Sequence, residues 1–183
     1  MRMMNRIAIT GVESAGKSTL GAALAEALNA VLVEEAARKD HEVLEEKVHL
    51  GTLERLGDTQ FQACLEAERH ALQTGRSTII TDTDATVLTL WGEHVWGAQP
   101  KGLEAFAAWP DFTLLCAPTI PWVNDPLRSM PNASDRWALH QKYEERLRGS
   151  VPWSLVDANT PQERLDQAVR AFLKFTSNTD SAH

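Results

Sequence analysis

A glycine-rich segment near the start of the chain constrains the fold more than any other stretch. It reads Gly11-Val-Glu-Ser-Ala-Gly-Lys-Ser-Thr19 and has the spacing G-x-x-x-x-G-K-[ST]. An apolar run at 6–10 precedes it, and after it leucines recur every four residues at Leu20, Leu24 and Leu28. A buried strand, a glycine loop and an amphipathic helix in this order predict a phosphate-binding P-loop. The alternative is an ordinary glycine turn before a helix.

The residue types of this segment suit a polyphosphate. The two glycines permit backbone angles that a side chain forbids, so the loop can wrap closely around a phosphate group. N–H groups of the loop and of the following helix then point at the phosphate oxygens. Lys17 is expected to reach the β- and γ-phosphates of ATP, and the Ser18 hydroxyl to bind Mg²⁺. The expected nucleotide-binding residues are Gly11, Glu13, Ser14, Ala15, Gly16, Lys17, Ser18 and Thr19.

The bulk properties are those of one globular domain. The chain has 183 residues, and we expect a domain at 1–175 followed by a flexible tail at 176–183. A net charge of -7 argues against non-specific binding to nucleic acid or to an anionic membrane. The two cysteines, Cys64 and Cys116, lack zinc-site spacing and are expected to be buried free thiols. These features, with no apolar run long enough to span a membrane, predict a cytoplasmic protein.

Strand-like and helix-like segments alternate along the chain. Short apolar, β-branched runs predict strands, and segments with helical periodicity fall between them. This alternation predicts an α/β P-loop NTPase fold, in which a five-stranded parallel sheet is flanked by helices. The strands are expected at 6–10, 30–33, 77–81, 112–116 and 153–157.

The helices are predicted from their apolar faces and end signals. Residues 36–47 are helix-prone, and Gly51 and Gly57 indicate a loop after them. The next helix is expected over 58–74, with Phe61, Leu65 and Leu72 facing inward. Further helices are expected after the third strand with Val87, Leu88, Trp91 and Val95 on one side, at 103–109, at 135–148, and from Thr160 to the tail.

Segments that carry acidic residues follow the first three predicted strands. Ligands of such sheets bind at the carboxyl ends of the strands, where these acids converge. Asp82 is placed to help hold Mg²⁺, and either Asp84 or Glu35 could accept the proton of an acceptor hydroxyl. The alternatives are that Asp82-Thr83-Asp84 is only a turn that caps a helix, and that Glu34 and Glu35 start a solvated helix.

A proline-rich stretch follows the fourth strand. Pro118, Pro121, Pro126 and Pro131 make it irregular, and we expect a lid over about 124–136. Arg128 and Arg136 would neutralise charge on the transferring phosphoryl group as this lid excludes water. The alternative is that both arginines are surface residues of a loop.

The P-loop indicates a nucleoside triphosphate but not its use. No N-K-x-D guanine-binding string occurs, and motor and AAA+ ATPases usually have longer chains with further domains. A compact chain therefore favours a small-molecule kinase that uses ATP and Mg²⁺.

Several motifs together resemble the ribosylnicotinamide kinase domain of NadR-type proteins. They are Gly11-x-Glu13-Ser14-x-Gly16-Lys17-Ser18, Glu35-x-x-Arg38, Asp82-Thr83-Asp84 and Trp122-Val123-x-Asp125-x-Leu127-Arg128. The resemblance implies phosphorylation of nicotinamide riboside by ATP, giving nicotinamide mononucleotide in NAD salvage. It also implies a role for each matching residue: Lys17 and Ser18 serve ATP and the metal; Glu35, Asp82 and Asp84 lie near the ribose and Mg²⁺; Arg38, Trp122 and Asp125 contact the nucleoside; Arg128 and Arg136 belong to the lid.

Two observations bear on the acceptor. An indole face attracts the cationic ring of nicotinamide riboside, which favours Trp122 as its partner; the alternative is a rim or core tryptophan. The other tryptophans are expected in the core or at an interface. Two other functions stay open. One is a kinase for another nucleoside, a nucleotide or a small alcohol. The other is a P-loop ATPase that acts as a switch or binding module. A homo-oligomer also stays open.

Overall fold

The computed structural model describes residues 4–123 and 129–180. Asp125, Arg128 and the part of the expected lid at 124–128 lie outside the described residues. The part at 133–136 forms the first turn of a helix, described below.

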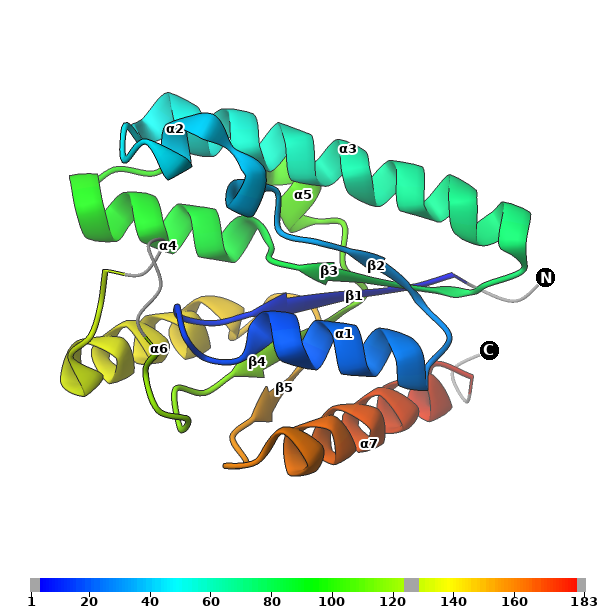
Figure 1. Cartoon of the computed structure of the whole chain (residues 1–183). Coiled ribbons are helices and arrows are strands. Elements are labelled where there is room, and N and C mark those ends of the chain that lie inside the picture. The colour runs from blue at the N-terminus through cyan, green and yellow to red at the C-terminus, as the bar shows by residue number, and fades with distance from the viewer. Residues whose placement is uncertain (1–3, 124–128, 181–183) are drawn as a thin grey trace.

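A parallel five-stranded sheet forms the centre of the molecule, as the sequence predicts (Figure 1). Its strand order is β2-β3-β1-β4-β5, so the P-loop strand β1 lies in the middle with neighbours on both sides. Ile7 and Ile9 on β1 are completely buried. The strands are β1 (Asn5–Thr10), β2 (Val31–Val33), β3 (Thr78–Asp82), β4 (Phe112–Cys116) and β5 (Trp153–Val156).

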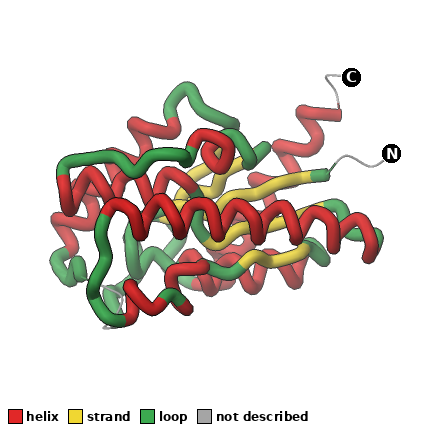
Figure 2. Tube along the Cα trace, turned by 90° about the horizontal axis from the view of Figure 1, so that it is seen from above, coloured by secondary structure: helices red, strands yellow, loops and turns green. Residues whose placement is uncertain are grey.

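Helices cover both faces of this sheet. In Figure 1, α3 and α4 lie above it and α1 and α7 below it, and Figure 2 shows the long α3 running along the strands. Two hydrophobic clusters match this arrangement: one contains residues of α1, α6 and α7, the other residues of α3, α4 and α5. The helices are α1 (Lys17–Ala27), the 3-10 helix η1 (Ala36–Lys39), α2 (His41–Leu44), α3 (Leu50–Thr74), α4 (Ala85–Trp96), α5 (Glu104–Ala107), α6 (Ala133–Leu147) and α7 (Pro161–Asp180).

Helix α3 corrects the loop predicted around Gly51 and Gly57. It begins at Leu50, because the His49 side chain accepts a hydrogen bond from the N–H of Thr52, whose hydroxyl in turn accepts from the N–H of His49. A Cβ on Gly57 would lie 2.1 Å from Leu103 Cδ2, so this glycine allows close packing and does not end the helix. Gly75 ends α3 as predicted, with φ of 69°. Leu72, expected inside, is exposed.

Two further segments differ from their predictions. Residues 36–47 do not form one helix, because the backbone is extended at Asp40, where η1 ends and α2 begins. At the other end of the chain α7 continues to Asp180, so the tail expected from 176 is helical over its first residues. The start of α7 is capped by Thr160, whose hydroxyl accepts from the N–H of Glu163 and donates to the Glu163 carboxylate.

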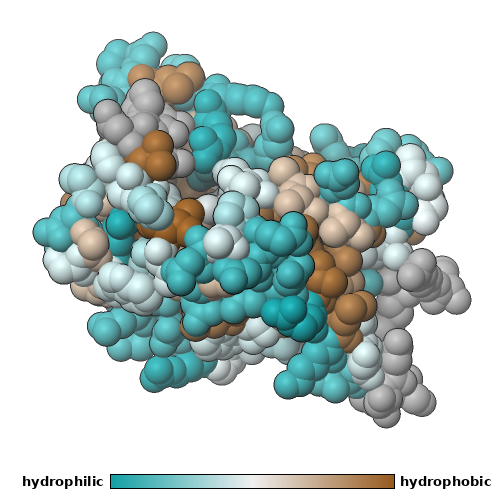
Figure 3. All heavy atoms as spheres, turned by 60° about the horizontal axis from the view of Figure 1, so that its bottom comes forward, coloured by the Kyte–Doolittle hydropathy of each residue, from teal (hydrophilic) through white to brown (hydrophobic). Residues whose placement is uncertain are grey.

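The surface carries scattered apolar residues. On the face shown in Figure 3, hydrophilic and intermediate residues predominate and surround small hydrophobic patches. Within the described part of the chain, no helix has both the length and the apolar character needed to cross a bilayer.

Candidate functional site

The P-loop between β1 and α1 has the backbone that its sequence predicts. Gly11 has φ of +132°, and a Cβ there would lie 2.6 Å from the carbonyl oxygen of Cys116 on β4. Gly16, with φ of +77°, caps α1. The Lys17 ammonium donates hydrogen bonds of 2.9 Å to the carbonyl oxygens of Gly11 and Val12. The lysine side chain therefore folds back over the loop.

Arg164 of α7 hydrogen-bonds to the P-loop backbone, and it is not among the site residues predicted from the sequence. The side chain is buried, and it donates to the carbonyl oxygens of Ala15 in the P-loop at 2.8 Å and of Ala117 after β4 at 3.3 Å. It also donates to Thr119 Oγ1 and to the carbonyl oxygen of Ala158. A positive charge in the first turn of a helix interacts unfavourably with the helix dipole. This unfavourable position is the one feature of the sequence that could have indicated a special role for Arg164.

Glu13 connects the P-loop to the far side of the expected lid. Its carboxylate accepts from the backbone N–H groups of Ser129, at 2.9 Å, and Met130. The indole N–H of Trp122 lies 3.4 Å from the same carboxylate. Residues on both sides of 124–128 thus meet at one P-loop side chain.

Glu35 and Arg38 lie beside the metal-binding hydroxyl expected at Ser18. The Arg38 guanidinium lies 3.3 Å from Glu35 and donates to Ser18 Oγ at 3.1 Å. A carboxylate following β2 is therefore linked to the start of α1 through one arginine. This brings together two groups that the sequence assigned to substrate and to metal.

Gln60 of α3 fixes the backbone on both sides of Glu35. Its amide oxygen accepts from the N–H of Ala36 at 2.8 Å, and its amide nitrogen donates to the carbonyl oxygen of Glu34 at 3.1 Å. The same nitrogen donates to Thr81 Oγ1 on β3. The side chain is 1% exposed, and a buried amide with its groups satisfied specifies one local geometry. Gln60 lies in the helix predicted over 58–74, but its partners are more than 20 positions away, so the sequence pattern does not indicate these contacts.

The acids after β3 are buried beneath the site. Asp84 accepts from Thr10 Oγ1 at 2.8 Å and from the N–H of Val87 at 3.0 Å, so it caps α4. Burial raises its pKa, although both hydrogen bonds act in the opposite direction. Asp82 Oδ1 is buried without a hydrogen-bond partner among the described residues, and Thr83 between the two acids has φ of +145°. Such backbone strain persists where the surrounding structure holds it, often at functional sites.

Arg136 lies in the first turn of α6 and is also buried. Its Nε and one terminal nitrogen find no hydrogen-bond partner in the described parts of the chain. A buried guanidinium with unsatisfied N–H groups favours an anionic ligand.

A cavity of about 820 Å³ opens beside the P-loop. Of the candidates from the sequence, it is lined by the whole run Gly11 to Thr19 and by Glu35 and Arg38. Asp82, Asp84, Trp122 and Arg136 are not among its lining residues. Trp91 and Trp96 line it, although the sequence analysis placed them in the core or at an interface.

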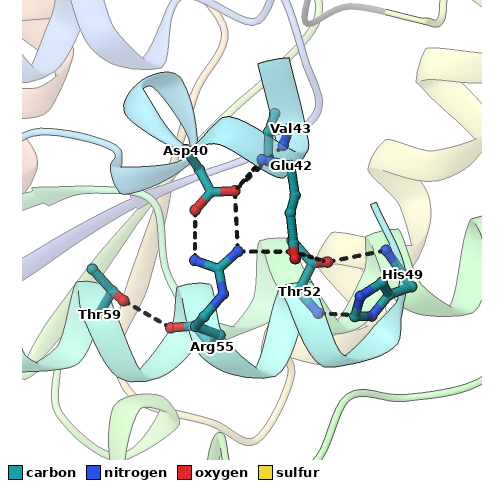
Figure 4. A network of polar contacts seen from close by, with 7 residues as sticks. All are labelled: Asp40, Glu42, Val43, His49, Thr52, Arg55 and Thr59. Atoms are coloured by element: carbon teal, nitrogen blue, oxygen red, sulfur yellow. Dashed lines mark hydrogen bonds and ion pairs between the residues drawn. The ribbon is translucent and has the colours of Figure 1, made fainter. Parts of the chain in front are cut away.

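A polar network joins α2 and its N-terminal cap to α3 (Figure 4). Arg55 of α3 pairs with Asp40 at 2.6 Å and with Glu42 at 2.8 Å. Asp40 caps α2 by accepting from the N–H groups of Glu42 and Val43. The network ties α2 to α3, and Val43 lines the cavity.

Comparison with known proteins agrees with this architecture. The model of the family AAA_28, described as an AAA domain, matches residues 6–164. No curated protein sequence is significantly similar to this one.

Solved structures of kinases share the fold at low sequence identity. A NadR protein in complex with NR superposes with a TM-score of 0.70 at 20% identity, covering 96% of this chain and 52% of that chain. A thymidylate kinase from Ehrlichia chaffeensis has a TM-score of 0.64 at 13% identity, covering 93% of this chain and 99% of its own. A deoxyadenosine kinase from M. mycoides with bound dCTP has a TM-score of 0.58 at 14% identity, covering 92% and 99%.

These likenesses establish the fold. The chain spans about half the length of the NadR chains that it matches. Its fold is that of P-loop kinases for nucleosides and other small molecules, and the P-loop implies nucleotide binding. Because the family model covers most of the sequence and the sheet and loop have the matching architecture, the protein belongs to the AAA_28 family of P-loop AAA domains.

Proposed function

We propose that this protein transfers the γ-phosphoryl group of ATP to a hydroxyl group of a small molecule. The observation that carries the proposal is the cavity, which is lined by the P-loop and also by Glu35 and Arg38. Space for a polyphosphate and space for a second molecule are thus continuous. The kinase folds of the similar structures support the same reaction class.

Glu35 is the best-placed general base. It lines the cavity, whereas Asp84 is buried and caps α4. In the proposed step the acceptor oxygen forms a bond to the γ-phosphorus, and the bond from that phosphorus to the β–γ bridging oxygen breaks. The hydroxyl proton passes to Glu35, and ADP leaves with the bridging oxygen. Lys17 and the loop N–H groups hold the phosphates, and Arg136 is proposed to join them from α6.

The residues present fit a magnesium ion. Asp82 has a buried carboxylate oxygen with no hydrogen-bond partner among the described residues, and Ser18 presents a hydroxyl at the P-loop, so these two residues would hold it. Among the described residues no group of three or more His, Cys, Asp or Glu forms a metal site of its own. This agrees with Mg²⁺, which keeps several water and phosphate ligands. When bound, the ion neutralises charge on the phosphate oxygens.

Nicotinamide riboside is the acceptor that we propose first. The motifs shared with NadR-type kinase domains support it, and so does the fold likeness to a NadR protein in complex with NR. Trp122 and Asp125 remain proposed contacts to this acceptor, and Arg128 a proposed contact to ATP.

The experiment is an ADP-release assay with Mg²⁺, ATP and a panel of nucleosides, nucleotides and small alcohols. ADP should form only when an acceptor is present, fastest with nicotinamide riboside. Lys17→Ala should lower the rate about 10²–10³-fold, as expected for one lost charge-stabilising donor. Lys174→Ala, on the exposed face of α7, is the matched control and should leave the rate unchanged.

The panel also separates the alternatives. Preference for a different nucleoside, a nucleotide or an alcohol would support the kinase activity but reject nicotinamide riboside as the acceptor. Slow ATP turnover that no small molecule alters would reject the kinase and favour a switch or binding module.

A further inference from the structure

Most of the cavity-lining residues outside the P-loop are apolar. They come from α2, α3, α4 and α6 and from the loops that precede α3 and α6. We call this part the apolar chamber; its residues are Val43, Val48, Leu53, Leu56, Val87, Leu88, Trp91, Val95, Trp96, Met130, Leu139 and Tyr143.

The chamber opens to solvent through apolar side chains. Val95 is 46% exposed and Trp96 is 37% exposed, although both line the cavity. Trp91, one turn before Val95 on α4, is half-buried and packs against both hydrophobic clusters. Exposed apolar surface that lines a concave site is typical of a ligand-binding surface.

Polar groups of the cavity lie outside the chamber. Glu35 and Arg38 stand at the P-loop end, and Glu46 lies in the segment between α2 and α3. Glu46 has φ of +56°, an unusual backbone conformation for a residue other than glycine, asparagine or aspartate. Inside the chamber the side-chain polar atoms are the Tyr143 hydroxyl and the two indole N–H groups.

We propose that the chamber binds the body of the acceptor by apolar and aromatic contact, with Trp91 as a specificity-determining residue. This inference rests on the proposed function. The acceptor class is a sugar or polyol joined to an aromatic ring that carries few hydrogen-bonding groups. Its hydroxyl end faces Glu35. Its ring lies against Trp91 rather than Trp122, because Trp91 lines the cavity and Trp122 does not.

The chamber disfavours ordinary nucleobases for a physical reason. A purine or pyrimidine edge carries several donors and acceptors, and each one that loses water without gaining a partner weakens binding. For such atoms the side chains of the chamber offer only the Tyr143 hydroxyl and two indole N–H groups. Nicotinamide riboside, with one carboxamide, belongs to the accepted class, and adenosine and uridine do not.

The test is calorimetric binding of phenyl β-riboside, nicotinamide riboside, adenosine and uridine, in the presence of Mg²⁺ and a non-hydrolysable ATP analogue. The two ribosides with simple rings should bind at least tenfold more tightly than adenosine or uridine. Trp91→Ala should weaken phenyl riboside at least tenfold, and Trp91→Phe should keep its affinity within about threefold. Trp137→Ala, on the exposed side of α6, is the control and should change nothing.

A second variant guards against misfolding of Trp91→Ala. Val95→Asp places a charge at the exposed mouth of the chamber and should weaken phenyl riboside at least fivefold, with the affinity for the ATP analogue unchanged. Binding of adenosine or uridine that is tighter than that of the two simple-ring ribosides overturns the proposal. So does unchanged phenyl riboside affinity in Val95→Asp and in folded Trp91→Ala.

The binding and turnover measurements distinguish failure of the chamber proposal from failure of the kinase proposal. If the protein binds phenyl riboside through Trp91 but phosphorylates no acceptor, the proposed binding role of the chamber stands and the proposed kinase activity is rejected. If the protein phosphorylates adenosine or uridine in preference to the simple-ring ribosides, the proposed kinase activity stands and the proposed specificity of the chamber is rejected.

Discussion

At the scale of single residues, burial separates the two carboxyl groups that compete as general base. Asp84 is 4% exposed and hydrogen-bonded on β1 and α4, whereas Glu35 lines the cavity beside Arg38. From the sequence the two were equivalent, because both follow strands of one parallel sheet. Only the contacts of Asp84 with Thr10, 74 positions away, distinguish them.

Substitution by the amide tests this assignment. Glu35→Gln should lower kcat about 10²–10⁴-fold, the usual contribution of a general base. Asp84→Asn keeps an oxygen that accepts from Thr10 and Val87, so kcat should stay within about threefold of wild type. The opposite pattern in steady-state kinetics would make Asp84 the base.

The raised pKa of Asp84 gives the same variant a stability signature. Folding makes this carboxyl group hold its proton more tightly, so its ionisation lowers the free energy of unfolding as pH rises above the unfolded pKa near 3.8. Asp84→Asn removes this loss and should be at least as stable as wild type at pH 7 in urea titrations. A clear destabilisation at pH 7 would contradict the explanation.

Arg164 is a positioning residue for the P-loop. Arg164→Met leaves the carbonyl oxygens of Ala15, Ala117 and Ala158 without a charged donor, and we expect a loss of about 3 kcal/mol in the free energy of unfolding. The KM for ATP should rise more than that for the acceptor. Arg170→Met, exposed on the same helix, is the control and should change neither. A stability loss without any change in KM for ATP would make Arg164 only structural.

At the scale of elements, the segment from η1 to α3 departs most from its sequence pattern. The strands and the P-loop were predictable because their signals are local: apolar runs, paired glycines and a helix behind them. The start of α3 was not, because Gly57 packs against Leu103, which is distant in the sequence. A glycine that permits close packing and a glycine that makes a turn look alike in a sequence.

The ion-pair network of this segment predicts a pH dependence. The hydrogen bonds from Arg55 hold the pKa of Asp40 at about 2, below its ordinary value of 3.8. A depressed pKa adds stability above the unfolded pKa, and this is lost as pH falls from about 4 through about 2. Between pH 5 and pH 2.5, wild type should therefore lose more free energy of unfolding than Asp40→Asn, which keeps a capping side chain. Parallel pH profiles in urea titrations would refute this.

At the scale of the whole molecule, the two hydrophobic clusters enclose both cysteines. Cys64 lies in the cluster of α3, α4 and α5, and Cys116 in the cluster of α1, α6 and α7. Their buried free state was predicted correctly from their apolar neighbours in the sequence. The apolar chamber was not predicted, because its wall combines side chains from segments nearly a hundred positions apart.

The thiols report on global unfolding. Burial raises the pKa of Cys64 to about 12 and also raises that of Cys116, so neither is a reactive thiolate at neutral pH. A thiol reagent such as DTNB at pH 8 should label neither in the native protein and both in urea. Rapid labelling of native protein would show that one of the clusters opens locally.

The central claim is that a phosphoryl group crosses one continuous cavity from the P-loop to an acceptor. The most direct measurement is mass spectrometry of the acceptor, beside ADP and inorganic phosphate, after incubation with Mg²⁺, ATP and nicotinamide riboside or phenyl riboside. We predict phosphorylated acceptor in an amount equal to the ADP formed, with no excess inorganic phosphate. ADP matched by inorganic phosphate, with the acceptor unchanged, would contradict the claim.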